Sequence, residues 1–208
     1  MEPRIPPLVP PYPDDVEQDL RKMMPPGVPP IALFRVVANN ARVLARMRRG
    51  SLLDPGSISL RQRELVILRT TALCRAEYEW SVHAAFFGAA AGFTPAQLVA
   101  TVHAVERPPS AESDDLWTDE EKLLLELVSS LHVSADVDDS LWHRLALHFT
   151  SEQLIELVFL VGLYHAVSFT TNALRLPLEP GAPRFPERAG TRPVSAPPPV
   201  DAGSTLRS

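Results

Sequence analysis

The middle of the chain contains a succession of helix-start signals, and this feature constrains the fold most strongly. A capping Ser or Thr followed three residues later by Gln or Glu occurs at Ser59, Thr94, Thr118 and Thr150. At Thr94 the next residue is Pro95, which is favoured at the first position of a helix. No segment shows the sustained alternation of polar and apolar residues that is typical of strands. The sequence therefore predicts an all-α protein without a sheet.

The expected helices follow from these start signals and from glycines at helix ends. A pattern resembling a capping box at Asp14–Glu17 predicts a short helix that stops near Met24. A second helix is expected from Ile31 to about Arg49, where Gly50 ends it. Further helices are expected from the Ser59 cap to about Arg75, from about Ala76 to Ala91, and after each of the three threonine caps.

A weak internal repeat indicates two similar helical hairpins. Phe93–Leu98 resembles Phe149–Leu154, and the cap at Ser59 is matched upstream of the second copy by the cap at Thr118. Hairpins too apolar to stand alone would pack against one another. Coincidence among common helix-start signals is the alternative, although the order of the signals favours a repeat.

Glu64 stands out when the two copies are aligned. It lies five residues after Ser59, where the second copy has Leu123. On a helix it shares a face with Ile67, Leu68 and Thr71. A carboxylate on an apolar face lowers stability unless it is paired or hydrogen-bonded. Glu64 is therefore the first candidate functional residue.

His83 is the second candidate. Its neighbours are apolar or aromatic, and Glu79 precedes it by one helical turn. A carboxylate at that spacing raises the basicity of an imidazole and fixes its orientation. Glu64, Glu79 and His83 could form a proton relay in a pocket lined by Tyr78, Trp80 and Phe87. The alternatives are a hydrogen-bonded core histidine and a Glu–His pair on the surface.

The prolines divide the chain into three parts. They are concentrated in residues 1–30 and again from Pro177 to Pro199. We expect a proline-rich arm with a short helix over residues 1–30, a helical domain over 31–178, and a disordered tail over 179–208. The arm contains Ile5, Leu8, Val9 and Tyr12, so an ordered arm is equally compatible with the sequence.

Charge and composition exclude several classes of function. The net charge of −5 gives no basic surface for nucleic acid. The single cysteine, Cys74, cannot form an intrachain disulfide and fits a reducing cytoplasm. The N-terminus lacks the apolar region of a signal peptide, and the apolar stretch Leu154–Phe169 is expected to be too short to span a bilayer. No metal-ligand spacing and no glycine-rich phosphate loop is found, so neither a metal nor a cofactor is expected.

Two segments around the candidate residues carry a family resemblance. Arg61–Arg69 followed by Glu77–His83 resembles the core motif of carboxymuconolactone decarboxylase-like proteins. Phe34–Asn40, Gly92–Leu98, and Gln153–Gly162 with Tyr164, His165 and Asn172 extend the likeness. The resemblance implies an all-helical alkylhydroperoxidase D-like bundle that forms dimers, trimers or hexamers. It also implies a choice between decarboxylation of lactone acids and thiol-based peroxidase activity.

The peroxidase relatives carry the motif Cys-x-x-Cys-x-x-x-His with a glutamate upstream. On that motif His83 and Glu64 match, whereas Ala76 and Glu79 occupy the two cysteine positions. A peroxidase of this type needs both thiols to close and reopen a disulfide. Cys74 precedes the first motif position by two residues, which places it on another helix face. We expect it to be a small buried residue, and we disfavour alkylhydroperoxidase or peroxiredoxin activity.

The remaining chemistry is proton transfer on a small organic acid. His83 is predicted as general acid/base, with Glu79 or Glu64 orienting it, for decarboxylation, isomerisation or lactone opening. The predicted substrate-binding residues are Arg61 or Arg69 for a carboxylate, Tyr78 and Trp80 for a flat molecule, and His165. The rival hypothesis is a non-catalytic oligomeric binding module. In both cases the apolar run Leu154–Val161 is expected at a subunit interface of a homo-oligomer.

Overall fold

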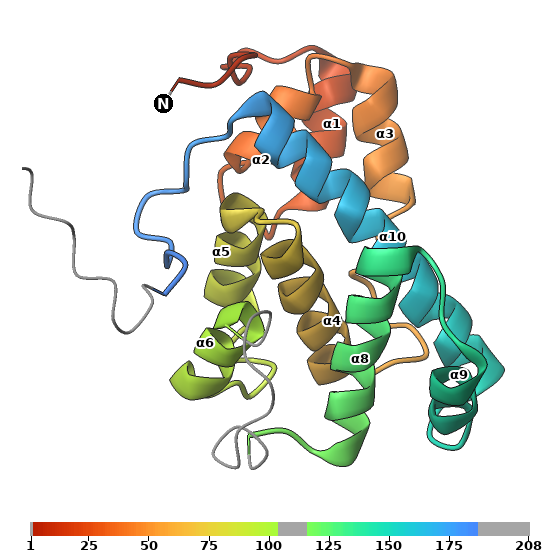
Figure 1. The fold of residues 1–208 in the computed structure, drawn as a ribbon. Helices are drawn as coiled ribbons and strands as arrows, with labels where there is room; N and C mark the ends of the chain where they lie inside the picture. Colours follow the sequence, from red (N-terminus) through yellow and green to blue (C-terminus); the bar gives the residue numbers. More distant parts are fainter. Residues whose placement is uncertain (1, 104–115, 187–208) are drawn as a thin grey trace, which may run out of the picture.

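The computed structural model describes residues 2–103 and 116–186. In these residues the chain forms helices and no strand, which confirms the all-helical prediction (Figure 1). The helices are α1 (Asp14–Met23), α2 (Ala32–Val37), α3 (Ala41–Arg49), α4 (Leu60–Leu73), α5 (Glu77–Phe86), α6 (Pro95–His103), α8 (Asp119–Ser134), α9 (Asp139–Ala146) and α10 (Ser151–Leu174).

Helix α4 is the centre of the bundle. Every residue from Arg63 to Ala72 is buried, so the helix is enclosed on all sides. It packs against α5, α6, α8 and α10, which surround it in Figure 1. A central helix determines where the surrounding helices lie. Any polar residue on it must be paired with another polar group inside the protein.

The predicted caps at the four Ser and Thr positions are all formed. At Ser59, Thr118 and Thr150 the side chain accepts a hydrogen bond from the third helical residue, whose side chain accepts one from the cap backbone. Thr94 makes the same two hydrogen bonds with Gln97. The capping-box prediction at Asp14 is wrong, because Pro13 precedes the helix and no side chain caps it.

The helix expected from residue 31 to 49 is two helices. Helix α2 ends at Val37 and α3 begins at Ala41. Asn40 adopts an extended conformation between them, and its side-chain oxygen accepts a hydrogen bond from the backbone N–H of Val43. An asparagine competes well for the cap position, so it starts a new helix rather than continuing the old one.

Both proline-rich ends lie against the bundle in the described residues. The arm forms backbone hydrogen bonds from Arg4 to Leu174 and from Leu8 to Arg35. At the other end Phe185 stacks on Trp80 with ring centroids 5.4 Å apart. Residues 179–186 are therefore placed on the surface of α2 and α5, which differs from the disorder expected there. The rest of the predicted tail lies outside the described residues.

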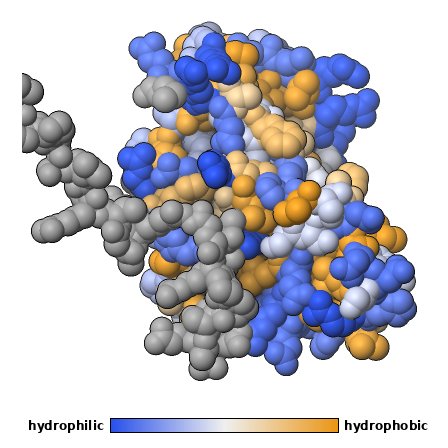
Figure 2. All heavy atoms as spheres, viewed as in Figure 1, coloured by the Kyte–Doolittle hydropathy of each residue, from blue (hydrophilic) through white to orange (hydrophobic). Residues whose placement is uncertain are grey.

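Helix α10 crosses the bundle with one face in the core and another at the surface. It is longer than the apolar stretch Leu154–Phe169, and its 24 residues would suffice to cross a membrane by length and composition alone, a test that a buried core helix also passes. Leu157, Leu160 and Val161 of the predicted interface run are buried within the chain itself. Ile155, Phe159 and Phe169 are instead exposed by 71%, 63% and 64%. Figure 2 shows apolar side chains interrupting the hydrophilic surface on one side of the molecule.

Candidate functional site

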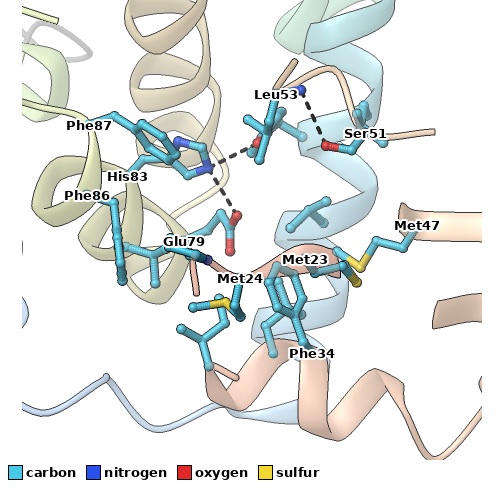
Figure 3. Close-up of a pocket in the computed structure, with 17 residues that line it drawn as sticks. Met23, Met24, Phe34, Met47, Ser51, Leu53, Glu79, His83, Phe86 and Phe87 are labelled. Carbon is cyan, nitrogen blue, oxygen red and sulfur yellow. Dashed lines mark hydrogen bonds and ion pairs between the residues drawn. The ribbon is translucent and has the colours of Figure 1, made fainter. Parts of the chain in front are cut away.

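A cavity of about 270 Å³ lies between the N-terminal helices and the α5–α10 pair. Its wall is largely apolar and includes Met23, Met24 and Met47 on one side and Phe86 and Phe87 on the other (Figure 3). The polar lining consists of Ser51, Glu79, His83 and Tyr164. An apolar cavity with a few converging polar groups is the usual form of a small-molecule site.

His83 of α5 is the centre of the polar group. Its Nδ1 lies 2.7 Å from Oε2 of Glu64 on α4. Its Nε2 lies 3.0 Å from the hydroxyl of Tyr164 on α10 and 3.4 Å from Oε1 of Glu79, one turn earlier on its own helix. Three helices thus bring their polar residues to a single imidazole.

Glu64 lies behind His83 and away from the cavity. It is fully buried and is not among the cavity-lining residues. Its other oxygen, Oε1, accepts hydrogen bonds from Nε and a terminal nitrogen of Arg63 at 3.0 and 2.9 Å. Arg63 in turn donates to the carbonyl of Leu53 at 2.6 Å. Arg63 therefore pairs with Glu64, and Glu64 fixes the orientation of the imidazole.

The charges of this group favour the protonated imidazole. Burial by itself lowers the pKa of His83, but hydrogen bonds to Glu64 and Glu79 and the charges of both outweigh it and raise the pKa to about 9. Protonated His83 and Arg63 then balance the two carboxylates. A buried cluster with balanced charges avoids the large cost of an isolated ion.

Tyr164 and Glu79 complete the cavity side of the site. Burial raises the pKa of Tyr164 well above its usual value, and the charges of Glu79 and Glu64 raise it further. The tyrosine therefore remains a neutral hydroxyl that can donate or accept. Oε2 of Glu79 is buried and has no hydrogen-bond partner among the described residues. This oxygen is available to a bound molecule or a water.

We expect stability to decrease as the pH rises through 9, because His83 binds its proton more tightly in the folded state. Its pKa rises from 6.5 to about 9, so the stabilising contribution is full below pH 6.5 and is lost as pH passes about 9. A shift of this size corresponds to about 3 kcal/mol. Urea unfolding across this range should show the decrease in the wild type and a much smaller one in His83→Gln. Equal pH profiles for the two proteins would contradict the assignment.

The structure brings together the three predicted catalytic residues but none of the predicted substrate-binding residues. Among the aromatic pair, the Tyr78 hydroxyl accepts from the backbone N–H of Leu33 at 3.0 Å and donates to Glu179 at 2.6 Å. Trp80 donates its indole N–H to Thr101 at 3.0 Å. Both are buried anchors that do not line the cavity.

The two predicted arginines are also engaged elsewhere. Arg61 forms an ion pair with Glu121 at 2.6 Å and donates to the carbonyls of Ala91 and Gly92. Arg69 donates to the carbonyl of Thr101 at 3.1 Å. Neither lines the cavity, so a substrate carboxylate there would meet protonated His83 rather than either arginine.

Cys74 and His165 lie together at a separate place. Cys74 is half-buried at the end of α4 and faces α8 and α10 rather than the cavity. Burial raises the pKa of its thiol, and the nearby Ser168 hydroxyl lowers it in part. His165 lies 3.0 Å from His132 of α8. The single thiol of the chain is therefore not part of the His83 group.

Sequence reasoning missed Tyr164 and Arg63 as parts of the site. Tyr164 lies on the same face of α10 as buried Leu157, Leu160 and Val161, so its hydroxyl stands on an apolar stripe. A polar group on an apolar helix face is the same feature that identified Glu64 from the sequence. Arg63 had no such signal, because an arginine beside a glutamate in sequence usually points to another face of the helix.

Comparisons with known proteins show similarity in sequence over part of the chain. Residues 39–108 match the sequence model of the carboxymuconolactone decarboxylase family. The match covers about a third of the chain, so this segment is similar to that family. The match includes Glu64, Glu79 and His83, whereas Tyr164 lies beyond it.

One curated relative is an uncharacterized protein, YnjA, of Escherichia coli K12. It is 39% identical to this chain over 74 residues, which are 35% of this chain and 40% of the relative. The chain therefore matches less than half the length of this relative.

Solved structures share the fold over most of the chain. An uncharacterized peroxidase-related protein of Silicibacter sp. TM1040 has a TM-score of 0.69 at 15% identity, covering 89% of this chain and 99% of that one. One from Ralstonia eutropha JMP134, described as an alkylhydroperoxidase AhpD core, has a TM-score of 0.68 at 14% identity, covering 86% and 95%. The debrominase Bmp8, in complex with 2,3,4-tribromopyrrole, has a TM-score of 0.67 at 14% identity, covering 86% and 94%. These identities establish the alkylhydroperoxidase D-like fold alone.

Proposed function

We propose that this protein catalyses acid–base chemistry on a small, largely apolar molecule bound in the cavity. The observation that carries the proposal is the placement of His83 on the cavity wall, bonded at once to Glu64, Glu79 and Tyr164. The reaction classes that suit this group are decarboxylation, isomerisation and lactone opening. Each passes through a negative charge that a positioned acid can stabilise and then protonate.

The roles follow from which atoms reach the cavity. Protonated His83 and the neutral Tyr164 hydroxyl are the donors for a developing oxyanion or carbanion. Glu79 supplies a carboxylate oxygen that can accept a proton from the substrate. Glu64 does not reach the cavity, so it acts as a positioning residue through its hydrogen bond to Nδ1 of His83.

The cavity wall indicates what kind of molecule would bind. The polar groups gather at the α5–α10 side, and methionine and phenylalanine side chains form much of the rest (Figure 3). Methionine adapts its shape to an apolar ligand without a strong geometric preference. A compact or flat organic acid with one polar end fits this distribution of groups.

Two alternatives remain from other classes. A non-catalytic binding module would use the same cavity. In that case the side chains of the His83 group would only hydrogen-bond to one another and would take no part in a reaction. Thiol peroxidase activity is disfavoured, because the sequence has one cysteine and that cysteine faces α8 and α10. We also expect a homo-oligomer in the cytoplasm, with the exposed apolar face of α10 as a candidate contact surface.

A substrate panel tests the proposed function. Small carboxylic acids, enolisable carbonyl compounds and lactones would be assayed with the wild type and His83→Gln, after circular dichroism shows equal folding. Halogenated pyrroles belong in the panel, since the debrominase neighbour was crystallised with one. We expect turnover of at least one compound that His83→Gln loses. Equal turnover in both proteins would exclude the relay, and binding without turnover would support the binding module.

A further inference from the structure

We propose that Cys74, His132 and His165 form a site for a borderline-soft divalent metal ion such as Zn²⁺. The three residues come from the end of α4, from α8 and from α10. One possible ligand atom from each lies within 4.8 Å of the other two. None of the three lines the cavity, so this site is separate from the His83 group. It is independent of the function proposed above.

The distances in the site match the coordination shell of zinc. Sγ of Cys74 lies 3.9 Å from Nδ1 of His132, and that nitrogen lies 3.0 Å from Nε2 of His165. Tetrahedral zinc, with bonds of about 2.3 Å to sulfur and about 2.0 Å to nitrogen, separates such pairs by about 3.5 and 3.3 Å. These two pairs need adjustments of about 0.4 Å or less to reach the zinc geometry. The ligand atoms of Cys74 and His165 lie within 4.8 Å of each other, so side-chain rotation would close the third pair.

The second ring nitrogen of His165 is held in the way that metal-binding histidines require. Nδ1 of His165 lies 2.8 Å from the carbonyl oxygen of Val161, to which its N–H donates. The lone pair is therefore on Nε2, which faces His132. A backbone carbonyl on the remote nitrogen is a common outer-shell partner of a metal-bound imidazole.

Without a metal, the contact between the two histidines requires a proton on Nδ1 of His132. That N–H donates to the Nε2 lone pair of His165 across the 3.0 Å contact. On metal binding, His132 shifts its proton to Nε2 and Nδ1 becomes a ligand. The Cys74 thiol releases its proton to solvent, so one proton is released for each ion bound.

Ser168 is a further observation that favours an ion at this place. Its hydroxyl is fully buried and has no hydrogen-bond partner among the described residues. It lies close enough to the Cys74 sulfur to favour the thiolate. When Cys74 is a metal-bound thiolate, it can accept a hydrogen bond from this buried hydroxyl, which then has a partner.

The nearby positive charge of Arg69 disfavours cation binding at this site. Its positive charge acts on His132, together with burial and the neighbouring His165, and so opposes a divalent cation there. The Cys74 thiolate offsets one charge. All three ligand residues are half-buried, so solvent can supply the fourth ligand. We expect that position to hold an anion taken from solvent, such as chloride, which offsets the second charge without releasing a further proton.

This site was not predicted, and no metal was expected, because its ligands are far apart in the chain. Cys74 and His132 are separated by 58 residues, and His132 and His165 by 33. Sequence spacing detects metal sites whose ligands lie on one turn or one helix. Here the packing of α8 and α10 on α4 assembles the ligands.

Metal titration of the chelator-treated full-length protein tests the proposal. We expect one Zn²⁺ per chain in competition with a chromophoric chelator, and a higher Tm in its presence. Co²⁺, used as a coloured substitute, should give a thiolate charge-transfer band and the intense visible bands of a four-coordinate site. The band should disappear in Cys74→Ser, and His165→Gln should weaken binding by about tenfold or more.

The control variant is His148→Ala, which removes an exposed histidine outside the cluster and should leave binding unchanged. Each variant must retain the wild-type circular dichroism spectrum before titration. Absence of stoichiometric Zn²⁺ binding to the wild type would overturn the proposal. So would Co²⁺ spectra that are identical in the wild type and Cys74→Ser. Because His83 lies outside the site, failure here would leave the substrate panel unaffected.

Discussion

Replacing His83 with glutamine should reduce turnover of the best substrate by about 10²- to 10⁴-fold, the usual contribution of a positioned acid or base. The imidazole is the one group that contacts Glu64, Glu79 and Tyr164 together. Glutamine retains hydrogen-bonding capacity but cannot carry a proton in the reaction. We therefore expect kcat to fall, with a smaller change in KM, in steady-state assays at neutral pH.

Two further variants make this test specific. Tyr164→Phe removes one donor at the cavity and leaves the proton on His83, so its effect on kcat should be smaller. His148→Gln changes an exposed histidine and should have no effect. If Tyr164→Phe abolished turnover while His83→Gln retained it, the tyrosine rather than the histidine would be the acid.

Replacing Glu64 with alanine should lower the free energy of unfolding by about 3–5 kcal/mol, the range for breaking a buried ion pair. The substitution leaves Arg63 and His83 buried without their carboxylate, and it opens a void in the centre of α4. Urea unfolding near pH 6.5 measures the change, since His83 is then protonated.

The matched comparisons are Asp54→Ala and Glu64→Gln. Asp54 is an exposed acidic residue, so its removal should change stability by less than about 0.5 kcal/mol. Glu64→Gln keeps the shape and some of the hydrogen bonds, and we expect an intermediate loss. A loss for Glu64→Ala as small as that for Asp54→Ala would show that the pair contributes little.

The helical fold and the start of each main helix could be predicted because these depend on local chemistry. The cap at Ser59 and those at the three threonines use a side chain and a backbone group three residues away. The same local rules failed at Asn40, where a cap interrupts what the apolar pattern presents as a single helix. They also missed α9, which begins at the Asp138 cap.

The candidate site was predicted in part, and the limit has a physical reason. Glu64 and His83 were identifiable because a charged or polar residue on an apolar face needs a partner. Their meeting at 2.7 Å, with Tyr164 beside them, depends on how α10 crosses α4 and α5. Tyr78 and Trp80 carried an equally strong aromatic signal, yet they anchor Glu179 and Thr101 away from the cavity.

A pocket beside His83 was expected, but most of its wall was not. Of the three aromatic residues predicted to line it, Phe87 does so, whereas Tyr78 and Trp80 do not. Its methionines come from α1, α3 and the turn after α1, which were assigned only to an arm and a helix. A cavity arises where packed helices leave space, and that depends on crossing angles that one sequence does not specify. The side chains of Met23, Met24 and Met47 therefore became functional candidates only through the structure.

The central claim is that His83 is held as a protonated acid by two carboxylates at the wall of a cavity. An NMR titration of the imidazole of His83, assigned by its loss in His83→Gln, measures this most directly. We predict an imidazolium at pH 7 with a pKa of about 9, which Glu64→Gln shifts downward. A pKa at or below the ordinary histidine value of 6.5, unchanged in Glu64→Gln, would contradict it.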